Sequence, residues 1–249
     1  MVTAMRRIFF SAALLVGGLG VVTQAGASGI SLSGTRLIFD GSKDAATIAV
    51  NNTSASDVWL MRFWVSPYGG SSSAGDDGSS QASTPFIVTP PLYRLDPDNA
   101  VQLRVNRVKD TLPADRESVF YLNSLAIPPK KGEKGYEKAV QSGLQFAVNT
   151  RIKLIYRPAG LNDRKVVKAL PDKISVSAGG KGVVVKNPTP YYITLVKLSV
   201  NGKAVQTEQD TMVAPFGELS LASPVTHGRL SYSTVDDNGA QTPLTEKTF

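Results

Sequence analysis

The sequence predicts an all-β protein built from two β-sandwich domains. Short runs of Val, Ile, Leu, Tyr and Phe alternate with polar residues and are separated by Gly, Pro, Asn and Asp, a pattern typical of strands and turns. No segment has the 3.6-residue apolar period of an amphipathic helix. About 220 residues follow a predicted export signal, a length that suits one large domain or two smaller ones. The predicted strands are 30–39, 46–51, 58–65, 101–105, 119–126, 144–156, 182–186, 191–200 and 229–235.

The first residues, 1–27, have the features of a cleavable export signal. Arg6 and Arg7 precede an apolar run, and Ala25-Gly26-Ala27 fits the small-residue pattern of a cleavage site. The apolar run is shorter than the roughly 20 residues that a membrane-spanning helix needs, which favours a signal over an anchor. We therefore expect an exported protein without membrane insertion.

A domain boundary is predicted at Pro158. A long apolar strand ends there, because proline cannot donate to a sheet ladder. The following residues, 162–168, are polar and charged, and a second series of strands begins after them. The expected domains are 28–157 and 158–249. The Gly-, Ser- and Asp-rich insert 67–85 is expected to join two strands, and the sequence indicates no role for it.

Composition and motifs argue against an enzyme. The chain has no cysteine, so it forms no disulfide and carries out no thiol chemistry. It contains no Gly-x-Ser-x-Gly, phosphate-loop or dinucleotide motif, and His227 is its only histidine. Asp236 and Asp237 precede Asn238-Gly239, which favours a β-turn over a metal site. We expect no catalytic residue, metal or cofactor, although chemistry built only from Ser, Lys, Asp and Glu stays open.

The net charge of +7 is spread along the chain. A nucleic-acid-binding protein usually concentrates its basic residues in one patch or stripe. We therefore expect no nucleic-acid partner.

The segment 144–156 carries the strongest functional signal. Leu144, Phe146 and Val148 share one face, because strand side chains repeat every two residues. By the same alternation Lys153 lies on the opposite face, near the predicted domain junction. An ordinary half-buried strand would show this pattern too. A long strand whose edge pairs with another chain is the alternative that the basic residues before Pro158 favour.

Seven motifs, taken in order, resemble those of one family. They are 33–36, 89–92, 112–121, 126–129, 150–158, 187–192 and 237–240. Together they span nearly all of the exported chain and resemble the periplasmic pilus (fimbrial) chaperones of the PapD type. The modest loop 128–143 and the absence of cysteine resemble the short-loop branch. The resemblance implies two immunoglobulin-like domains in an L-shaped, boomerang arrangement with a cleft between them.

The resemblance also implies a set of site residues. Such chaperones complete a pilus subunit that lacks a strand, and the matching donor-strand residues are Leu144, Phe146 and Val148. Arg36 and Lys153 match the two basic residues that bind the subunit's C-terminal carboxylate.

Three further residues, Glu117, Arg157 and Asp237, match a network that sets the angle between the domains.

The implied function is a non-enzymatic periplasmic chaperone. It would bind, fold and cap pilus subunits, deliver them to an outer-membrane usher, and be able to form a homodimer when free. A pilus structural subunit or adhesin with two β-sandwich domains is the alternative. Such a subunit should carry an N-terminal donor extension, whereas the first strand predicted here starts close to the cleavage site. A sugar-active periplasmic enzyme is disfavoured because no catalytic constellation is present.

Overall fold

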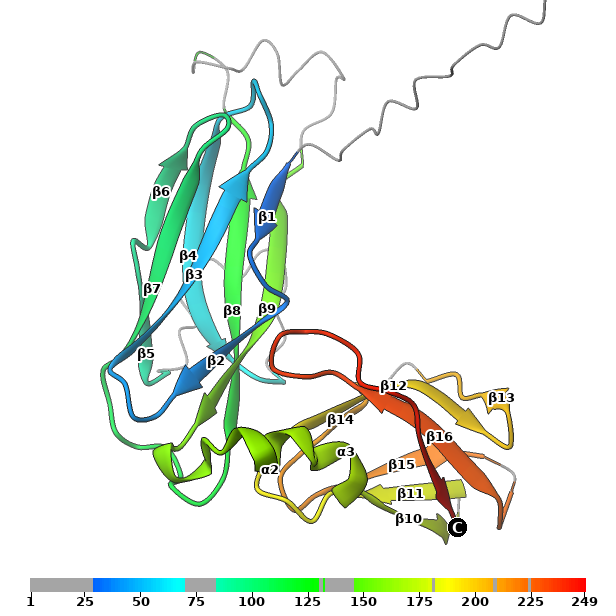
Figure 1. Ribbon diagram of the computed structural model, residues 1–249. Helices are drawn as coiled ribbons and strands as arrows, with labels where there is room; N and C mark the ends of the chain where they lie inside the picture. Colours follow the sequence, from blue (N-terminus) through cyan, green and yellow to red (C-terminus); the bar gives the residue numbers. More distant parts are fainter. Residues whose placement is uncertain are drawn as a thin grey trace, which may run out of the picture.

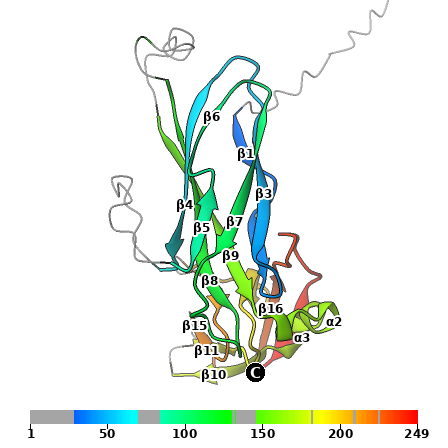
Figure 2. The same ribbon diagram turned by 90° about the vertical axis from the view of Figure 1, so that its left-hand side faces the viewer.

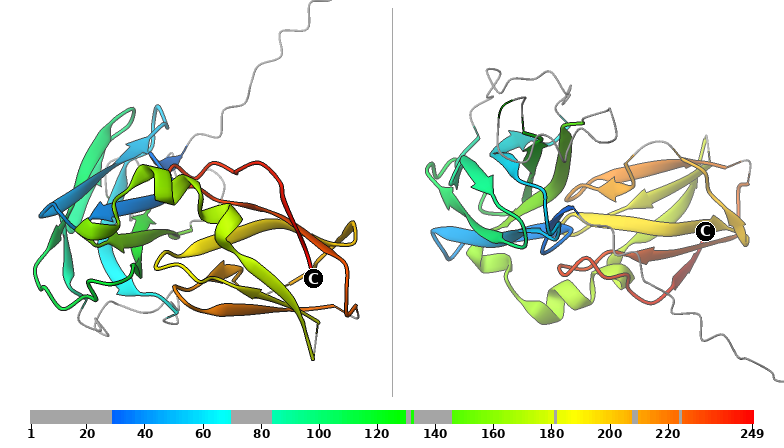
Figure 3. Two further views of the ribbon diagram at one scale, coloured as in Figure 1. Left: turned by 60° about the horizontal axis from the view of Figure 1, so that its bottom comes forward. Right: turned by 90° about the horizontal axis from the view of Figure 1, so that it is seen from above.

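The computed structural model describes two β-sandwich domains that meet at an angle, like the arms of an L (Figure 1). The described residues are 29–69, 84–129, 132, 146–180, 182–207, 210–223 and 225–249. The predicted signal 1–27, most of the insert 67–85 and Leu144 lie outside them. The view from above shows domain two extending away from the base of domain one (Figure 3). The predicted all-β, two-domain fold class is confirmed.

Domain one consists of two facing sheets (Figures 1 and 2). One has the strand order β1-β3-β7-β5, and the other has the order β2-β9-β8-β4-β6. The strands are β1 (Ile30–Leu32), β2 (Arg36–Asp40), β3 (Ala45–Asn52), β4 (Trp59–Pro67), β5 (Phe86–Thr89), β6 (Leu92–Leu95), β7 (Ala100–Arg107), β8 (Ser118–Ile127) and β9 (Val148–Arg157). β9 runs antiparallel to β8 and parallel to β2.

The core of domain one lies between these sheets. Phe39 from β2 and Leu103 from β7 are fully buried in it. From β9, alternate residues Ile152, Leu154 and Tyr156 enter the same core. Burial of each large apolar side chain contributes roughly 1.5–3 kcal/mol. The C-terminal half of β9 is therefore anchored firmly in domain one.

The prediction of one continuous strand over 30–39 is wrong, because the chain changes sheets there. β1 pairs with β3, whereas β2 pairs with β9 in the opposite sheet. Ser33 marks the crossing: its amide donates to the carbonyl of Ala49 at 2.9 Å, and its hydroxyl accepts from the amide of Ala49 at 3.1 Å. The crossing brings Arg36 to the start of β2, beside β9.

Domain two is a second sandwich with a short helical entry. One sheet has the order β10-β11-β15, and the other has the order β13-β12-β16-β17 with β14 also paired to β12. Its strands are β10 (Ser175–Gly179), β11 (Gly182–Lys186), β12 (Ile193–Val200), β13 (Lys203–Ala204), β14 (Met212–Val213), β15 (Glu218–Ala222), β16 (Arg229–Thr234) and β17 (Thr245–Thr248). Its core includes the fully buried Leu195, Leu230 and Tyr232.

The sequence pattern did not predict the helical entry. It consists of η1 (Ala159–Leu161), α2 (Arg164–Lys168) and α3 (Leu170–Lys173). These segments are too short to display a helical period, and helices of this length depend on tertiary packing. Asp163 caps α2 by accepting a hydrogen bond from the amide of Lys165 at 2.8 Å.

The two domains share a small apolar cluster. Val119 and Ile155 from domain one pack with Met212 from domain two, and all three are buried. Tyr68 and Tyr192, one from each domain, pack against this cluster. The domains therefore meet through side-chain packing as well as through the linker.

We predict that Gly239→Ala destabilises the protein more than Gly202→Ala. Both glycines have a positive φ, 84° and 77°, so both substitutions carry left-handed backbone strain of about 1–2 kcal/mol. A Cβ at Gly239 would also collide with the hydroxyl of Thr35 across the domain junction, whereas a Cβ at Gly202 meets no atom within 4 Å. Thermal unfolding measures both costs.

The matched control is Gly239→Ala combined with Thr35→Ala. Removal of the hydroxyl should bring the melting temperature back to that of Gly202→Ala, apart from the effect of Thr35→Ala alone. Equal melting temperatures for the two glycine variants would contradict the predicted contact.

Candidate functional site

Two basic residues lie side by side at the domain junction. Arg36 begins β2, and Lys153 is its register partner on β9. Register partners in a parallel pair project from the same face, and neighbouring strands lie about 4.8 Å apart. Their side chains therefore share one face of the sheet, the face opposite the core side chains of β9.

The guanidinium of Arg36 has an incomplete set of partners. Its Nη1 donates to the backbone carbonyl of Val235 in domain two at 3.2 Å. Its Nε is buried and has no hydrogen-bond partner among the described residues. Burial lowers the pKa of Arg36, while Asp237 and Asp236 oppose that shift through their charge. Since no described carboxylate forms an ion pair with Arg36, its guanidinium can donate hydrogen bonds to an anionic ligand.

The ammonium of Lys153 already has a counter-ion. Its Nζ lies 3.2 Å from Oδ2 of Asp210, a residue of domain two. Tyr68 donates its hydroxyl hydrogen to the same carboxylate, and its ring centroid lies 5.9 Å from Nζ. Arg36 and Lys153 thus contact different parts of domain two. Asp210 neutralises the charge of Lys153, whereas no described carboxylate forms an ion pair with Arg36.

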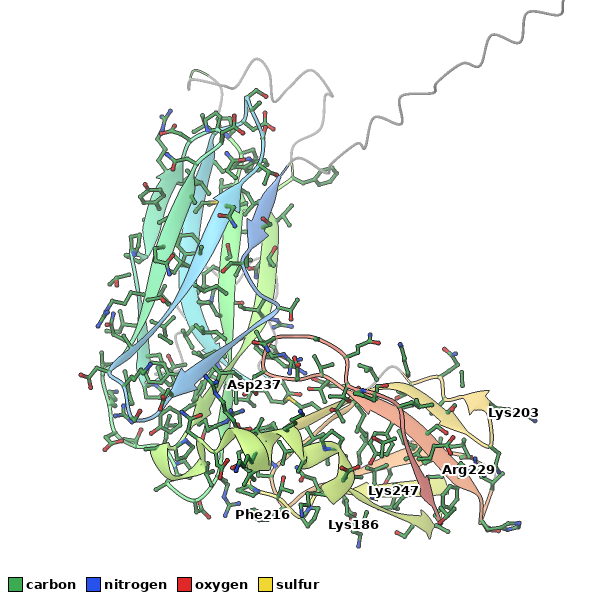
Figure 4. All side chains as sticks on the ribbon, in the orientation of Figure 1. Lys186, Lys203, Phe216, Arg229, Asp237 and Lys247 are labelled. Atoms are coloured by element: carbon green, nitrogen blue, oxygen red, sulfur yellow. The ribbon has the colours of Figure 1, made fainter. Side chains whose placement is uncertain are left out.

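A buried ion network joins the domains next to this pair. Arg157, at the end of β9, donates from Nε to Glu117 at 2.7 Å and from Nη1 and Nη2 to the two oxygens of Asp237, each at 2.7 Å. Glu117 also accepts the amide of Tyr192 at 2.7 Å. Burial raises the pKa of Glu117, and Arg157 opposes that shift. Figure 4 shows Asp237 at the junction between the domains.

The N-terminal half of β9 has an edge that pairs with no other described strand, and exposed apolar side chains lie beside it. β2 covers β9 only from Lys153 to Arg157, and no described strand pairs with the same edge of residues 148–152. Phe146 and Val148 are 65% and 53% exposed, although their face continues into the buried core of domain one. An uncovered edge with exposed apolar side chains is a template for strand addition.

The sequence analysis did not identify three residues at the junction. Tyr68 and Asp210 contact Lys153 or its counter-ion, and Met212 packs between the domains. None of them lies in a recognisable motif or an alternating pattern that would have marked it. Their roles arise from the angle at which the domains meet.

The structure places the remaining titratable candidates in loops. His227 is exposed in the turn before β16. Asp236 accepts the amides of Asn238 and Ala240 at 2.9 and 2.8 Å, as expected of a turn. Within the described ranges, no three His, Cys, Asp or Glu residues cluster as metal ligands. No helix in the same ranges is long and apolar enough to cross a membrane.

Comparison with known proteins establishes the class of protein. Residues 29–162 match the family model of the N-terminal domain of PapD, a pili and flagellar-assembly chaperone. Residues 169–246 match the model of the C-terminal domain of the pili assembly chaperone PapD. Together the two models span most of the chain, which therefore belongs to the PapD family of pilus-assembly chaperones.

Individual relatives are also named as chaperones. The chain is 39% identical over 217 residues to the chaperone protein LpfB of Salmonella typhimurium, with 86% of each chain covered. It is 36% identical over 225 residues to the chaperone protein MrkB of Klebsiella pneumoniae, covering 87% of this chain and 90% of that protein.

Solved structures that the chain resembles are chaperones too. The crystal structure of the periplasmic chaperone SfaE is 30% identical and superposes with a TM-score of 0.68, covering 88% of this chain and 98% of that one. The Salmonella enterica chaperone SafB, solved in complex with the SafA pilin, is 26% identical with a TM-score of 0.72, covering 90% and 98%. The chain is a pilus chaperone, and the alternative of a structural subunit is not supported.

We predict that Arg157→Ala strongly destabilises the chaperone itself. The side chain of Arg157 is 5% exposed, and its removal would leave the buried Glu117 without its ionic partner. Loss of one member of a buried ion pair costs about 3–5 kcal/mol. Melting temperature and periplasmic level of the protein are the measurements.

The control is Arg229→Ala, which removes a surface ion pair with Glu246 whose side chains are 59% and 48% exposed. Such pairs contribute about 0–1 kcal/mol. If Arg157→Ala melted like this control and only weakened client binding, Arg157 would belong to the binding surface instead.

Proposed function

We propose that this chaperone completes its client by donor-strand complementation along β9, and that Arg36 and Lys153 bind the client's C-terminal carboxylate. The observation that carries the proposal is one edge of β9, with which no described strand pairs over residues 148–152 and which β2 covers from Lys153 onward. A strand added to the open part must stop where β2 begins. That point is occupied by Arg36 and Lys153.

This geometry also sets the direction of the client strand. If its carboxylate lies at Lys153, its preceding residues lie beside 146–152, so the strand runs parallel to β9. Lys153 lies seven positions after Phe146, which corresponds to about 23 Å along a strand. The client's last six to seven residues, by the same rise of about 3.3 Å per residue, would span the donor segment.

The two parts of the site have different tasks in this proposal. Backbone pairing along the edge exchanges hydrogen bonds with water for hydrogen bonds with protein, so its net contribution is small. The exposed Phe146 and Val148, together with Leu144, supply apolar burial. The charge-assisted bonds to Arg36 and Lys153 supply register, because the main-chain carboxylate exists only at the C-terminus of the client.

We also propose how the chaperone reaches the periplasm and what it does with and without a client. Residues 1–27 direct export to the periplasm, and residues 28–157 and 158–249 form the two domains. The periplasmic location of the relative SfaE supports this. The chaperone delivers its client to an outer-membrane usher, carries out no catalysis, and is able to form a homodimer through its free β9 edge when no client is bound. A second copy could pair with the same edge of β9.

We predict that Arg36→Ala or Lys153→Ala abolishes client capture while the chaperone still folds. Removal of one partner from a buried, charged contact costs about 2–5 kcal/mol, largely because the client's charge is left unpaired. The measurements are the amount of co-expressed pilus subunit in the periplasm and the melting temperature of the chaperone.

Lys186→Ala is the control. Lys186 lies on the lower side of domain two (Figure 4), and its ammonium forms an exposed ion pair of 3.7 Å with Glu218. Wild-type subunit yield with the Arg36→Ala, Lys153→Ala double variant would refute the carboxylate site.

We predict graded losses of complex along the donor strand. Burial of a large side chain contributes roughly 1.5–3 kcal/mol, so Phe146→Ser should reduce complex yield more than Val148→Ser. Replacement of Leu144, Phe146 and Val148 together should remove about 5–9 kcal/mol on the same scale. Co-purification of the client measures each step.

Asn149→Ser provides the matched control, because Asn149 is exposed on the opposite face of β9 and should tolerate replacement. Equal losses at Val148 and Asn149 would show that the strand does not dock by its alternating apolar face.

A further inference from the structure

Lys153 binds a carboxylate of its own chain. Asp210, just before β14 in domain two, lies 3.2 Å from the Nζ of Lys153 through Oδ2 and 3.3 Å through Oδ1. The side chain of Lys153 is 19% exposed and that of Asp210 is 40% exposed, so water screens the pair only in part. The ammonium of Lys153, which is proposed to bind the client's carboxylate, is therefore already neutralised by Asp210.

Asp210 is held by donors other than Lys153. Tyr68 of domain one donates its hydroxyl hydrogen to Oδ2, and the amide of Met212 donates to Oδ1 at 3.0 Å. Burial would raise the pKa of Asp210, but the Tyr68 hydrogen bond and the charge of Lys153 outweigh it and hold the pKa below its usual range. The carboxylate is ionised at neutral pH and keeps two donors even without Lys153.

The three cations at the junction are neutralised to different degrees. Arg157 has two carboxylate partners, Lys153 has one, and Arg36 has only a backbone carbonyl among the described residues. A carboxylate that approaches the Arg36–Lys153 pair meets a guanidinium without a described carboxylate partner and an ammonium that is already paired with Asp210. Two carboxylates within reach of one ammonium repel each other, so both cannot be bound equally well.

We propose that Asp210 is a resident counter-ion of Lys153 in the client-free chaperone and gives way when the client's terminal carboxylate binds. Asp210 thereby lowers the affinity of the site and helps to set its selectivity. This inference rests on the carboxylate site of the proposed function. After Lys153 is released, Asp210 still accepts hydrogen bonds from the hydroxyl of Tyr68 and the amide of Met212. The Arg157 network is separate, so the angle between the domains persists during the exchange.

The test measures binding of a small carboxylate to the mature protein. The probes are N-acetyl-trialanine with a free C-terminal carboxylate and the same peptide with a C-terminal amide, titrated by NMR of the isotope-labelled chaperone. Asp210→Asn removes the charge and keeps the shape. We expect it to bind the acid about tenfold more tightly than the wild type does, with no change for the amide. Asp210→Ala is a second variant for which a gain of the same sign is expected.

Glu218→Gln is the matched control, because it changes the net charge equally but at an exposed site beside Lys186. An equal gain in this control, or unchanged or weaker acid binding in both Asp210 variants, would overturn the inference. The double variant Asp210→Asn, Lys153→Met should lose the gain, and a gain that persists without Lys153 would also overturn it.

The outcomes separate this inference from the proposed function. Acid-selective binding that disappears in Arg36→Ala but is unchanged in Asp210→Asn removes the role of Asp210 and leaves the carboxylate site intact. Equal binding of acid and amide by the wild type and every variant removes the carboxylate site itself.

Discussion

The guanidinium of Arg157 joins the two domains through a buried ion network. Its donors are divided between Glu117 of domain one and Asp237 of domain two, with three hydrogen bonds of 2.7 Å each. A buried charge is costly unless every partner is in place, so the network tolerates little change in the angle between the domains. The apolar cluster around Met212 and the close fit of Gly239 against Thr35 depend on the same angle.

β9 connects this network to the edge over residues 148–152. The face that carries Ile152, Leu154 and Tyr156 is buried in domain one, while the opposite face carries Lys153 toward domain two. Since the strand ends at Arg157, its position along the sheet is tied to the ion network. The buried C-terminal half thus supports an N-terminal half whose edge pairs with no other described strand and which carries the exposed side chain of Val148.

The basic pair shows why ion pairing and ligand binding oppose each other at such a junction. Arg36 is held by a neutral carbonyl and keeps its charge available, whereas Lys153 is neutralised by Asp210. A fully neutralised pair would offer little to a carboxylate, and a bare pair would repel itself across the parallel strands. If the pair binds a client carboxylate as proposed, one ion-paired and one unpaired cation would be a compromise between stability of the free protein and affinity for the client.

Local residue patterns determined much of this protein. Strand alternation and turn residues predicted the two sandwiches and the shared face of Phe146 and Val148, because these depend on neighbours a few residues apart. The family motifs named Arg36, Lys153 and the Arg157 network. Only the tertiary structure decided that the chain changes sheets after β1 and that Asp210, 57 residues from Lys153, reaches its ammonium. Such a contact depends on the angle between two separately folded sandwiches, which no local pattern encodes.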